Sequence, residues 1–317
     1  RLIVRLLHEA GVPADALVLV PGEGSVIGPV LVGDPRVAGV VFTGSTETAW
    51  GINRALAAKD HPIRPLVAET GGLNAVIVDN SALPEQVVGD VVESAFRSAG
   101  QRCSAARILC VQEEIAPRVI DMLTGAMAEL EVGDPGQLTT DVGPVIGETA
   151  KAGLLRHAAA IAAHGRLLYH CALDERHDHG SFVPPTAIEI DRISRLTRES
   201  FGPILHVVRF SGSAIDQVVD AVNATGYGLT FGIHSRIDET IERVASRIRA
   251  GNVYVNRNII GAVVGSQPFG GEGLSGTGFK AGGPHYLLRF VGERTLTVNT
   301  AAVGGNLALL GTLDDRG

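Results

Sequence analysis

FRSAGQRCS, at residues 96–104, is the stretch from which the interpretation of this sequence starts. It follows a segment with helical spacing of apolar residues, turns at Gly100 and presents a single thiol, Cys103, between an arginine and a serine. Upstream, ETGG at residues 69–72 places the carboxylate of Glu69 at the end of an apolar run. A lone cysteine is most often a buried core residue, and a carboxylate at a strand end can simply pair with an arginine. The pair forms a site only if the fold brings the two side chains together.

Composition and charge exclude several classes of protein. The chain has 317 residues, enough for about two domains, and is 45% hydrophobic and 4% aromatic with 40 glycines, which is typical of α/β proteins. A net charge of −7 without a run of lysine or arginine argues against a nucleic-acid surface. No stretch approaches the ~20 apolar residues that a transmembrane helix needs. The 3 cysteines match no zinc-ribbon spacing, which favours a reduced compartment, the cytoplasm.

Apolar runs and helical periodicities alternate along most of the chain. Apolar runs predict strands at 16–20, 37–43, 63–68, 74–78, 108–111, 186–190, 229–234 and 251–256. Helical spacing predicts helices at 1–11, 25–32, 83–99, 115–130, 148–164, 214–224 and 238–249. This alternation is typical of parallel α/β units. Near the end the chain changes to a glycine-dense loop at 261–273 and an alternating segment at 291–298, which predicts an edge strand for pairing between subunits.

A phosphate-binding turn is suggested where the run 37–43 enters Gly44, Ser45, Thr46 and Glu47. Ser45 or Thr46 can cap the helix that follows, and the free amides and dipole of a helix N-terminus attract an anion. The motif alone fits an ordinary strand-to-helix connection better, because the G-x-G-x-x-G fingerprint is absent.

The chemistry of the thiol and the carboxylate depends on their charge. Amides at the turn, or the neighbouring cations Arg102 and Arg107, are expected to lower the pKa of the Cys103 thiol. Burial of Glu69 is expected to raise its pKa and suit it to general base catalysis. No metal site is expected, because no standard ligand spacing occurs, even around His170, Cys171, His177 and His179.

Five short motifs together resemble those of the aldehyde dehydrogenase superfamily. They are FTGSTE at 42–47, ETGG at 69–72, GQRC at 100–103, ESFGP at 199–203 and PFGG at 268–271. They stand in the family's order and cover essentially the whole chain, with one departure at Thr70, where the commonest glutamate motif has leucine. The resemblance implies an aldehyde dehydrogenase-like α/β fold: an incomplete Rossmann-like cofactor domain, an α/β catalytic domain and a C-terminal oligomerisation strand.

The resemblance also implies a role for each motif. Cys103 would be the catalytic nucleophile, forming a thiohemiacetal and then a thioester, and Glu69 the catalytic base that activates water. NAD would be the cofactor, bound by Gly44, Ser45, Gly71, Glu199 and Phe201. Within the superfamily the chain looks most like L-glutamate γ-semialdehyde (Δ1-pyrroline-5-carboxylate) dehydrogenases. The α-amino acid end of that substrate would bind Ser104, Gly261 and Ala262.

The two ends of the chain shape the expected organisation. The tail at 295–310 resembles bifunctional proline utilisation proteins, in which a proline dehydrogenase domain with FAD precedes this enzyme and the full-length protein lies at the inner face of the membrane. The chain starts within a helical pattern without an initiator methionine, so it is expected to be a fragment. The resemblance implies the C-terminal part of an NAD-binding domain at 1–68 and a catalytic domain at 69–256. Residues 257–317 would form the substrate anchor loop, a return to the cofactor domain and the oligomerisation tail.

The family's oxyanion-hole asparagine and its lysine on the adenosine ribose match no segment before residue 44. The 317-residue chain alone is therefore expected to be inactive or poorly folded. The expected partners are a small-molecule aldehyde and further copies of the chain in a homo-oligomer. Two alternatives stay open: the same enzyme fold acting on another aldehyde, and a catalytically silent scaffold.

Overall fold

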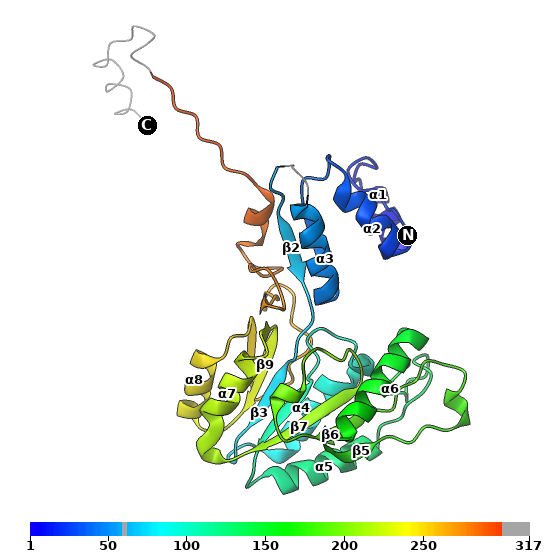
Figure 1. Cartoon of the computed structure of the whole chain (residues 1–317), viewed down its shortest axis with the longest axis vertical. Coiled ribbons are helices and arrows are strands. Elements are labelled where there is room, and N and C mark those ends of the chain that lie inside the picture. Colours follow the sequence, from blue (N-terminus) through cyan, green and yellow to red (C-terminus); the bar gives the residue numbers. More distant parts are fainter. Residues whose placement is uncertain (59–61, 300–317) are drawn as a thin grey trace.

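A seven-stranded sheet organises the protein in the computed structural model, which describes residues 1–58 and 62–299 (Figure 1). In spatial order the strands are β10 (Asn252–Val255), β9 (Thr230–His234), β3 (Ala75–Val78), β4 (Ile108–Gln112), β7 (Ile204–Phe210), β6 (Thr186–Glu189) and β5 (Arg166–His170). Neighbouring strands are parallel except β5 and β6. The prediction of parallel units is wrong for that pair. Residues 171–185 join them as a loop whose only regular element is the 3₁₀ turn η2 (Glu175–His177), whereas a parallel connection usually carries an α-helix.

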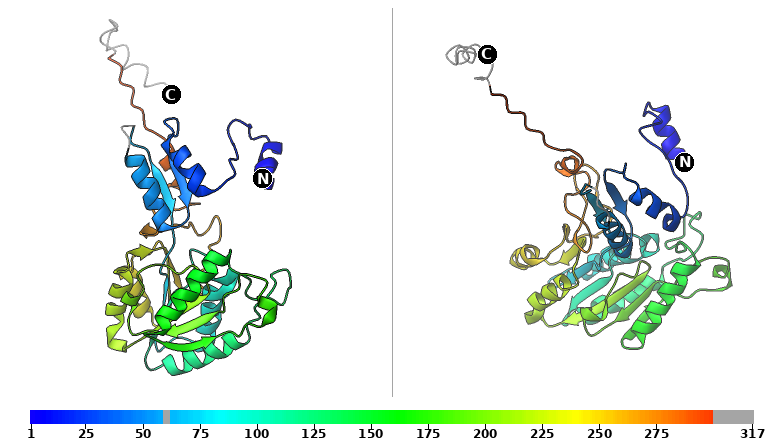
Figure 2. Two further views of the ribbon diagram at one scale, coloured as in Figure 1. Left: turned by 45° about the vertical axis from the view of Figure 1, so that its right-hand side comes forward. Right: turned by 45° about the horizontal axis from the view of Figure 1, so that its top comes forward.

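Helices cover both faces of this sheet (Figures 1 and 2). Close contacts join α4 (Pro84–Phe96) to α5 (Ala116–Ala128), α7 (Ile215–Asn223) to α8 (Asp238–Arg247), and α6 (Glu148–Ala162) to β6. Because both faces are covered, every residue of β3 and β4 is buried. Short 3₁₀ turns complete this part of the chain: η1 (Arg97–Gly100), η3 (Ile193–Arg195) and η4 (Gly212–Ala214).

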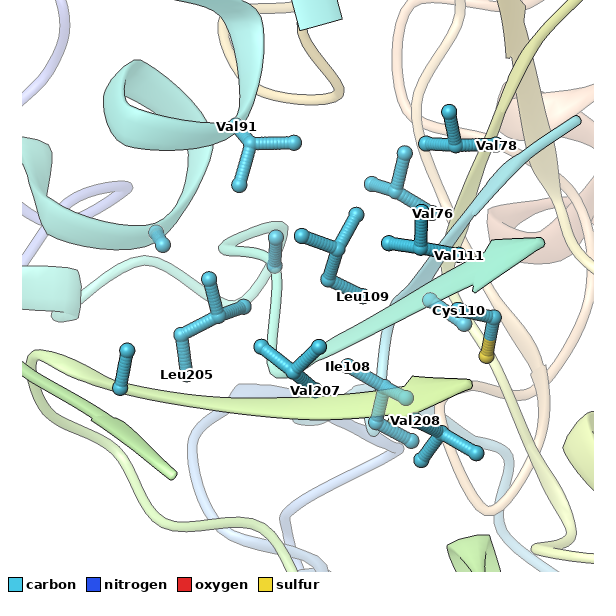
Figure 3. Close-up of a cluster of buried hydrophobic side chains, with 14 of the residues drawn as sticks. Val76, Val78, Val91, Ile108, Leu109, Cys110, Val111, Leu205, Val207 and Val208 are labelled. Carbon is cyan, nitrogen blue, oxygen red and sulfur yellow. The ribbon is translucent and has the colours of Figure 1, made fainter. Parts of the chain in front are cut away.

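The centre of the core lies between α4 and the middle strands (Figure 3). Val76 of β3 is in register with Leu109 of β4, which is in register with Val207 of β7, so the three side chains share one face of the sheet. Val91 of α4 belongs to the same buried cluster. This packing makes β4 a rigid support for the turn that precedes it, which carries Cys103.

A smaller two-stranded sheet lies beside the larger one. β1 (Val40–Thr43) pairs in parallel with β2 (Leu66–Glu69), and α3 (Thr46–Ala57) connects them. The chain then runs from β2 directly towards β3, so Glu69 lies at the junction between the two sheets (Figure 1). Helices α1 (Leu2–Glu9) and α2 (Gly24–Gly33) precede this sheet.

The strand predicted at 16–20 does not form, and that prediction is wrong. Val18, Leu19 and Val20 lie in an irregular, exposed segment between α1 and α2. A strand needs a neighbour to hydrogen-bond with, and in the described part of the chain β1 pairs only with β2.

The C-terminal part of the chain returns to the junction of the sheets. β11 (Glu272–Gly273) pairs antiparallel with β8 (Tyr227–Gly228), a bridge links Glu69 to Gly276, and the turn η5 (Tyr286–Phe290) follows. Residues 291–299 run away from the body of the protein without forming a strand within the chain, so pairing with a second subunit stays a prediction (Figures 1 and 2). Most of the tail at 295–310 lies outside the described residues. Among the described helices none has the length and apolarity required to cross a membrane.

Candidate active site

A cleft of about 860 Å³ is lined by residues of the smaller sheet, of the segments that precede β4 and β7, and of the C-terminal loop. Its walls contain every residue that the sequence singled out for the site except Gly261, whose neighbour Ala262 does line it. The lining also includes residues that the sequence did not single out as site residues: Thr43, Thr46, Glu47, Thr70, Gln101, Arg102, Tyr227 and Phe269. A concave site of this size suits a small-molecule ligand.

The nucleophile turn, residues 97–104, has an unusual backbone. Ser98, Ala99 and Gly100 all have left-handed dihedrals, with φ of 58°, 54° and 62°. Such a conformation costs roughly 1–2 kcal/mol for each non-glycine residue. A side chain at Gly100 would also collide with the backbone of Gly202, so glycine is required there. Near the end of the turn Cys103 lies half-buried at the cleft.

The pKa of the Cys103 thiol is raised, chiefly by burial and then by the charge of Glu199, with a smaller effect of Glu69. Amides of Ser104 and of Cys103 itself hydrogen-bond the sulfur and act in the opposite direction. The pKa is therefore raised overall and not lowered as expected: the guanidinium of Arg107 pairs with Glu199, 3.0 Å away, and its charge interaction with Cys103 is the weaker one. The thiolate has to form by loss of its proton to a base or to water.

Glu69 ends β2 half-buried, with one oxygen accepting a hydrogen bond from the amide of Gly271 at 3.1 Å. Its other oxygen is buried without a partner. Burial raises the pKa of Glu69 to about 7, although the Gly271 amide and the charges of Arg289 and Lys280 oppose that shift. Within the described residues Glu69 forms no ion pair with an arginine, so the alternative of a structural pair finds no support. A carboxylate with this pKa can exchange protons near neutral pH.

The residues predicted to bind NAD all line the cleft. Ser45 caps α3, as one of the two predicted alternatives, by accepting the amide of Thr48 at 3.2 Å, and the N-terminus of α3 faces the cleft. Phe201 exposes 45% of its surface, and the carboxylate of Glu199 is almost buried. A side chain at Gly71 would overlap that carboxylate, which explains the glycine. A helix N-terminus for phosphate, a carboxylate for ribose hydroxyls and an open ring for a flat base fit a nicotinamide dinucleotide.

The residues predicted to bind the substrate are only partly gathered. Ser104 and Ala262 line the cleft together with Cys103, whereas Gly261 has a left-handed φ of 69° and lies outside the lining.

Two polar residues, Asn74 and Arg107, hydrogen-bond the backbone of the nucleophile turn. The sequence did not predict either role. Asn74 donates to the carbonyl oxygens of Cys103 at 2.7 Å and Ala105 at 2.9 Å, and accepts the amide of Thr230. Arg107 is fully buried directly before β4. The available signal was a polar residue at the start of an otherwise apolar strand, where burial requires hydrogen-bond partners.

The histidines near 170–180 do not form a metal centre. His177 is buried and contacts the carbonyl oxygen of Val132 at 2.9 Å, and it forms a capping box with Asp174. In residues 1–58 and 62–299 no cluster of His, Cys, Asp and Glu could hold a metal ion.

A buried histidine pair behind the site predicts acid sensitivity. His206 Nδ1 lies 2.8 Å from the carbonyl oxygen of Arg107, which can only accept, so Nδ1 carries the proton. Its Nε2 must then accept from His157 Nε2 at 2.9 Å. Burial lowers the pKa of His206 to about 3, so folding favours its neutral form.

In the unfolded chain His206 titrates near pH 6.5, so the unfolded state binds more protons between about pH 6.5 and pH 3. We expect the stabilisation from neutral His206 to be complete above this range and to be lost as the pH falls through it. His206→Asn keeps a donor to the Arg107 carbonyl oxygen without titrating. Its free energy of unfolding, from urea titrations at pH 7.5, 6 and 5, should fall less steeply than that of the wild type by up to ~1 kcal/mol per pH unit. Equal slopes would contradict this account.

The fold and the cleft define an α/β protein whose chemistry would centre on a thiol and a carboxylate beside a dinucleotide-type turn. The chain belongs to the aldehyde dehydrogenase family, whose sequence profile matches residues 1–296. The nucleophile turn and residues 69–72 therefore belong to the fold that the members of this family share.

Three known proteins illustrate the similarity. The bifunctional protein PutA of Klebsiella aerogenes is 55% identical over 299 residues, covering 92% of this chain and 23% of that protein. A crystal structure of Bradyrhizobium japonicum proline utilization A is 59% identical with a TM-score of 0.90, covering 95% of this chain and 30% of that one. A 1-pyrroline-5-carboxylate dehydrogenase from Thermus, solved with bound NAD, is 34% identical with a TM-score of 0.85, covering 91% and 56%. The chain thus spans about a quarter of the PutA length.

Proposed function

We propose that this chain carries the NAD-dependent oxidation of L-glutamate γ-semialdehyde to L-glutamate. The observation that supports it most is the meeting of Cys103 and Glu69 in one cleft, which Ser104 and Ala262 also line. The similarity to a 1-pyrroline-5-carboxylate dehydrogenase supports this substrate, because 1-pyrroline-5-carboxylate is the cyclic form of L-glutamate γ-semialdehyde.

The chemistry divides between the thiol and the carboxylate. The Cys103 thiolate attacks the aldehyde carbon, and the amides at the turn, which already bond the sulfur, keep it oriented. Bound NAD would accept the hydride that converts the thiohemiacetal to a thioester. Glu69, with its pKa near 7, then takes a proton from the water that attacks the thioester and releases the acid.

The polar end of the substrate is assigned to Ser104, Gly261 and Ala262. Ser104 offers a hydroxyl, and the backbone of the loop at Gly261 and Ala262 offers amides, which suit an α-carboxylate. The cofactor is assigned to Gly44, Ser45, Gly71, Glu199 and Phe201. Residues 1–68 would form part of the cofactor domain, 69–256 the catalytic domain and 257–317 the anchor loop and tail. A homo-oligomer and a proline dehydrogenase domain with FAD in the same polypeptide stay predictions.

The proposal is tested in the 317-residue chain and in a chimera that carries the chain in place of the matching segment of the Klebsiella aerogenes relative. We expect the chimera to oxidise pyrroline-5-carboxylate with a kcat/KM at least ~100-fold above that for propanal, because the site pairs with the polar end of the substrate. Ser104→Ala should lower kcat/KM for pyrroline-5-carboxylate and leave that for propanal unchanged.

Other outcomes identify the alternatives. A preference for propanal would contradict the substrate assignment and keep the enzyme class. Absence of turnover in the chimera, with Cys103 no more reactive to iodoacetamide than Cys110, would support a silent scaffold. Turnover by the 317-residue chain alone at the chimera's rate would contradict the expectation that it is inactive or poorly folded.

A further inference from the structure

The most deeply buried cation beside the cleft is Arg107, the largest fully buried side chain among the described residues. A guanidinium without water costs several kcal/mol unless it is paired and hydrogen-bonded. Arg107 makes four such contacts, each to a residue at or next to the cleft. Nη1 donates to the carbonyl oxygens of Gly100 at 2.7 Å and Gly202 at 3.1 Å. Nη2 donates to the carbonyl oxygen of Arg102 at 3.1 Å and to Glu199 Oε1 at 3.0 Å.

These contacts join two turns that lie about a hundred positions apart in the sequence. Gly100 and Arg102 belong to the nucleophile turn, residues 97–104, whereas Glu199 and Gly202 belong to the turn between β6 and β7. The two turns also meet directly, because a side chain at Gly100 would collide with the Gly202 carbonyl. The guanidinium lies 5.4 Å from the centre of the Phe201 ring. One side chain therefore contacts the nucleophile turn and both residues of the second turn that are assigned to NAD.

The nucleophile turn needs an external constraint. Ser98 and Ala99 hold left-handed dihedrals that L-residues leave readily, and strained turns persist only where the surroundings fix them. Gln101 supplies part of that constraint by accepting the amide of Ile146 at 2.8 Å. Arg107 supplies the buried part, through the carbonyl oxygens of Gly100 and Arg102.

Arg107 is itself fixed at its backbone. Its carbonyl oxygen accepts both the amide of His206 at 2.9 Å and the His206 ring at 2.8 Å, and its amide donates to the carbonyl oxygen of Asn74. The guanidinium thus projects from a rigid strand end, so its position is set by the sheet and not by the turns that it joins.

We propose that Arg107 is a positioning residue that holds the nucleophile turn against the turn that contains Glu199 and Gly202. The thiol of Cys103 and the carboxylate assigned to NAD then keep one fixed geometry. The proposal rests on the proposed function. Arg107 touches no reacting atom, and it acts through the backbone of Gly100 and Arg102 and through the carboxylate of Glu199.

The test combines dissociation constants for NADH with hydrogen exchange of the two turns, in the chimera. Arg107→Lys keeps the charge but cannot reach four acceptors from one nitrogen, and Glu199→Gln keeps the size of the acceptor. Each is expected to weaken NADH binding by about 10-fold, and the double variant by about the same 10-fold instead of 100-fold, because both act on NADH through the same contact between Arg107 and Glu199. Arg209→Lys is the matched control, since Arg209 pairs with Glu189 and lies outside the cleft lining.

Hydrogen exchange without NADH or aldehyde tests the coupling separately. Glu199→Gln alone should speed exchange in the peptide at 97–104, although its substitution lies in the other turn, and Arg209→Lys should not. Independent, multiplying effects on NADH binding would overturn the proposal, as would unchanged exchange at 97–104. If the wild-type chimera binds no NADH, the proposed function fails, whereas exchange still decides the role of Arg107.

Discussion

Cys103→Ala is expected to lower kcat/KM for aldehyde oxidation by about 10⁴-fold or more, because no other thiol in the described residues faces the cleft. Without the sulfur there is no covalent adduct from which a hydride can leave. The variant should fold as the wild type does, because the side chain is half-exposed and removing it leaves no closed cavity. The measurement is NADH formation with pyrroline-5-carboxylate in the chimera.

Cys110→Ala is the matched control. Cys110 lies within β4, fully buried, and burial raises the pKa of its thiol to about 12. Its loss should change turnover by no more than a few-fold. Site-resolved alkylation by iodoacetamide should find Cys103 modified first, with Cys110 and Cys171 protected by burial. Residual oxidation by Cys103→Ala at more than ~1% of the wild-type rate would remove the thiol from the mechanism.

Local sequence signals predicted much of the scaffold. The helix after Ser45 and the turn at 199–203 between two strands follow from near-neighbour chemistry, such as capping and glycine turns, and the structure contains both. The prediction of a strand at 16–20 failed because strand formation depends on a partner strand that the segment itself does not contain. The prediction of parallel strands failed at β5 for a related reason, because the direction of a strand follows from its connection and not from its own composition.

The site shows the same division. Cys103, Glu69 and Glu199 could be chosen from short motifs, but the direction of the thiol pKa could not. That direction depends on how deeply Cys103 is buried and on where Arg107 points, and both are set by contacts with residues far along the chain. Gly261 and Ala262 were predicted together, and only Ala262 lines the cleft.

Glu69→Gln is expected to separate the two halves of the reaction. The first turnover should still release a burst of NADH, because thioester formation does not need the carboxylate to activate water. Steady-state turnover should fall by about 10²–10⁴-fold, since hydrolysis of the thioester loses its base. Rapid mixing with pyrroline-5-carboxylate in the chimera measures both phases. Glu272→Gln, in the exposed strand β11 close to the same loop, is the control and should keep both.

The pH dependence gives the second half of the same test. Glu69 acts as a base only when ionised, and burial holds its pKa at about 7, so steady-state turnover of the wild type should rise with pH through about 7. Glu69→Gln should lack that rise. The folded state binds the extra proton here, so ionisation of Glu69 also removes stability as the pH climbs from about 4.5 to 7, and the glutamine variant should be the more stable one at pH 8. A variant that lost burst and steady state equally, or kept the rise near pH 7, would show that Glu69 is not the base. One oxygen of Glu69 has no hydrogen-bond partner, and this keeps the carboxylate basic enough to deprotonate water. A partner that stabilised the carboxylate would also lower its basicity.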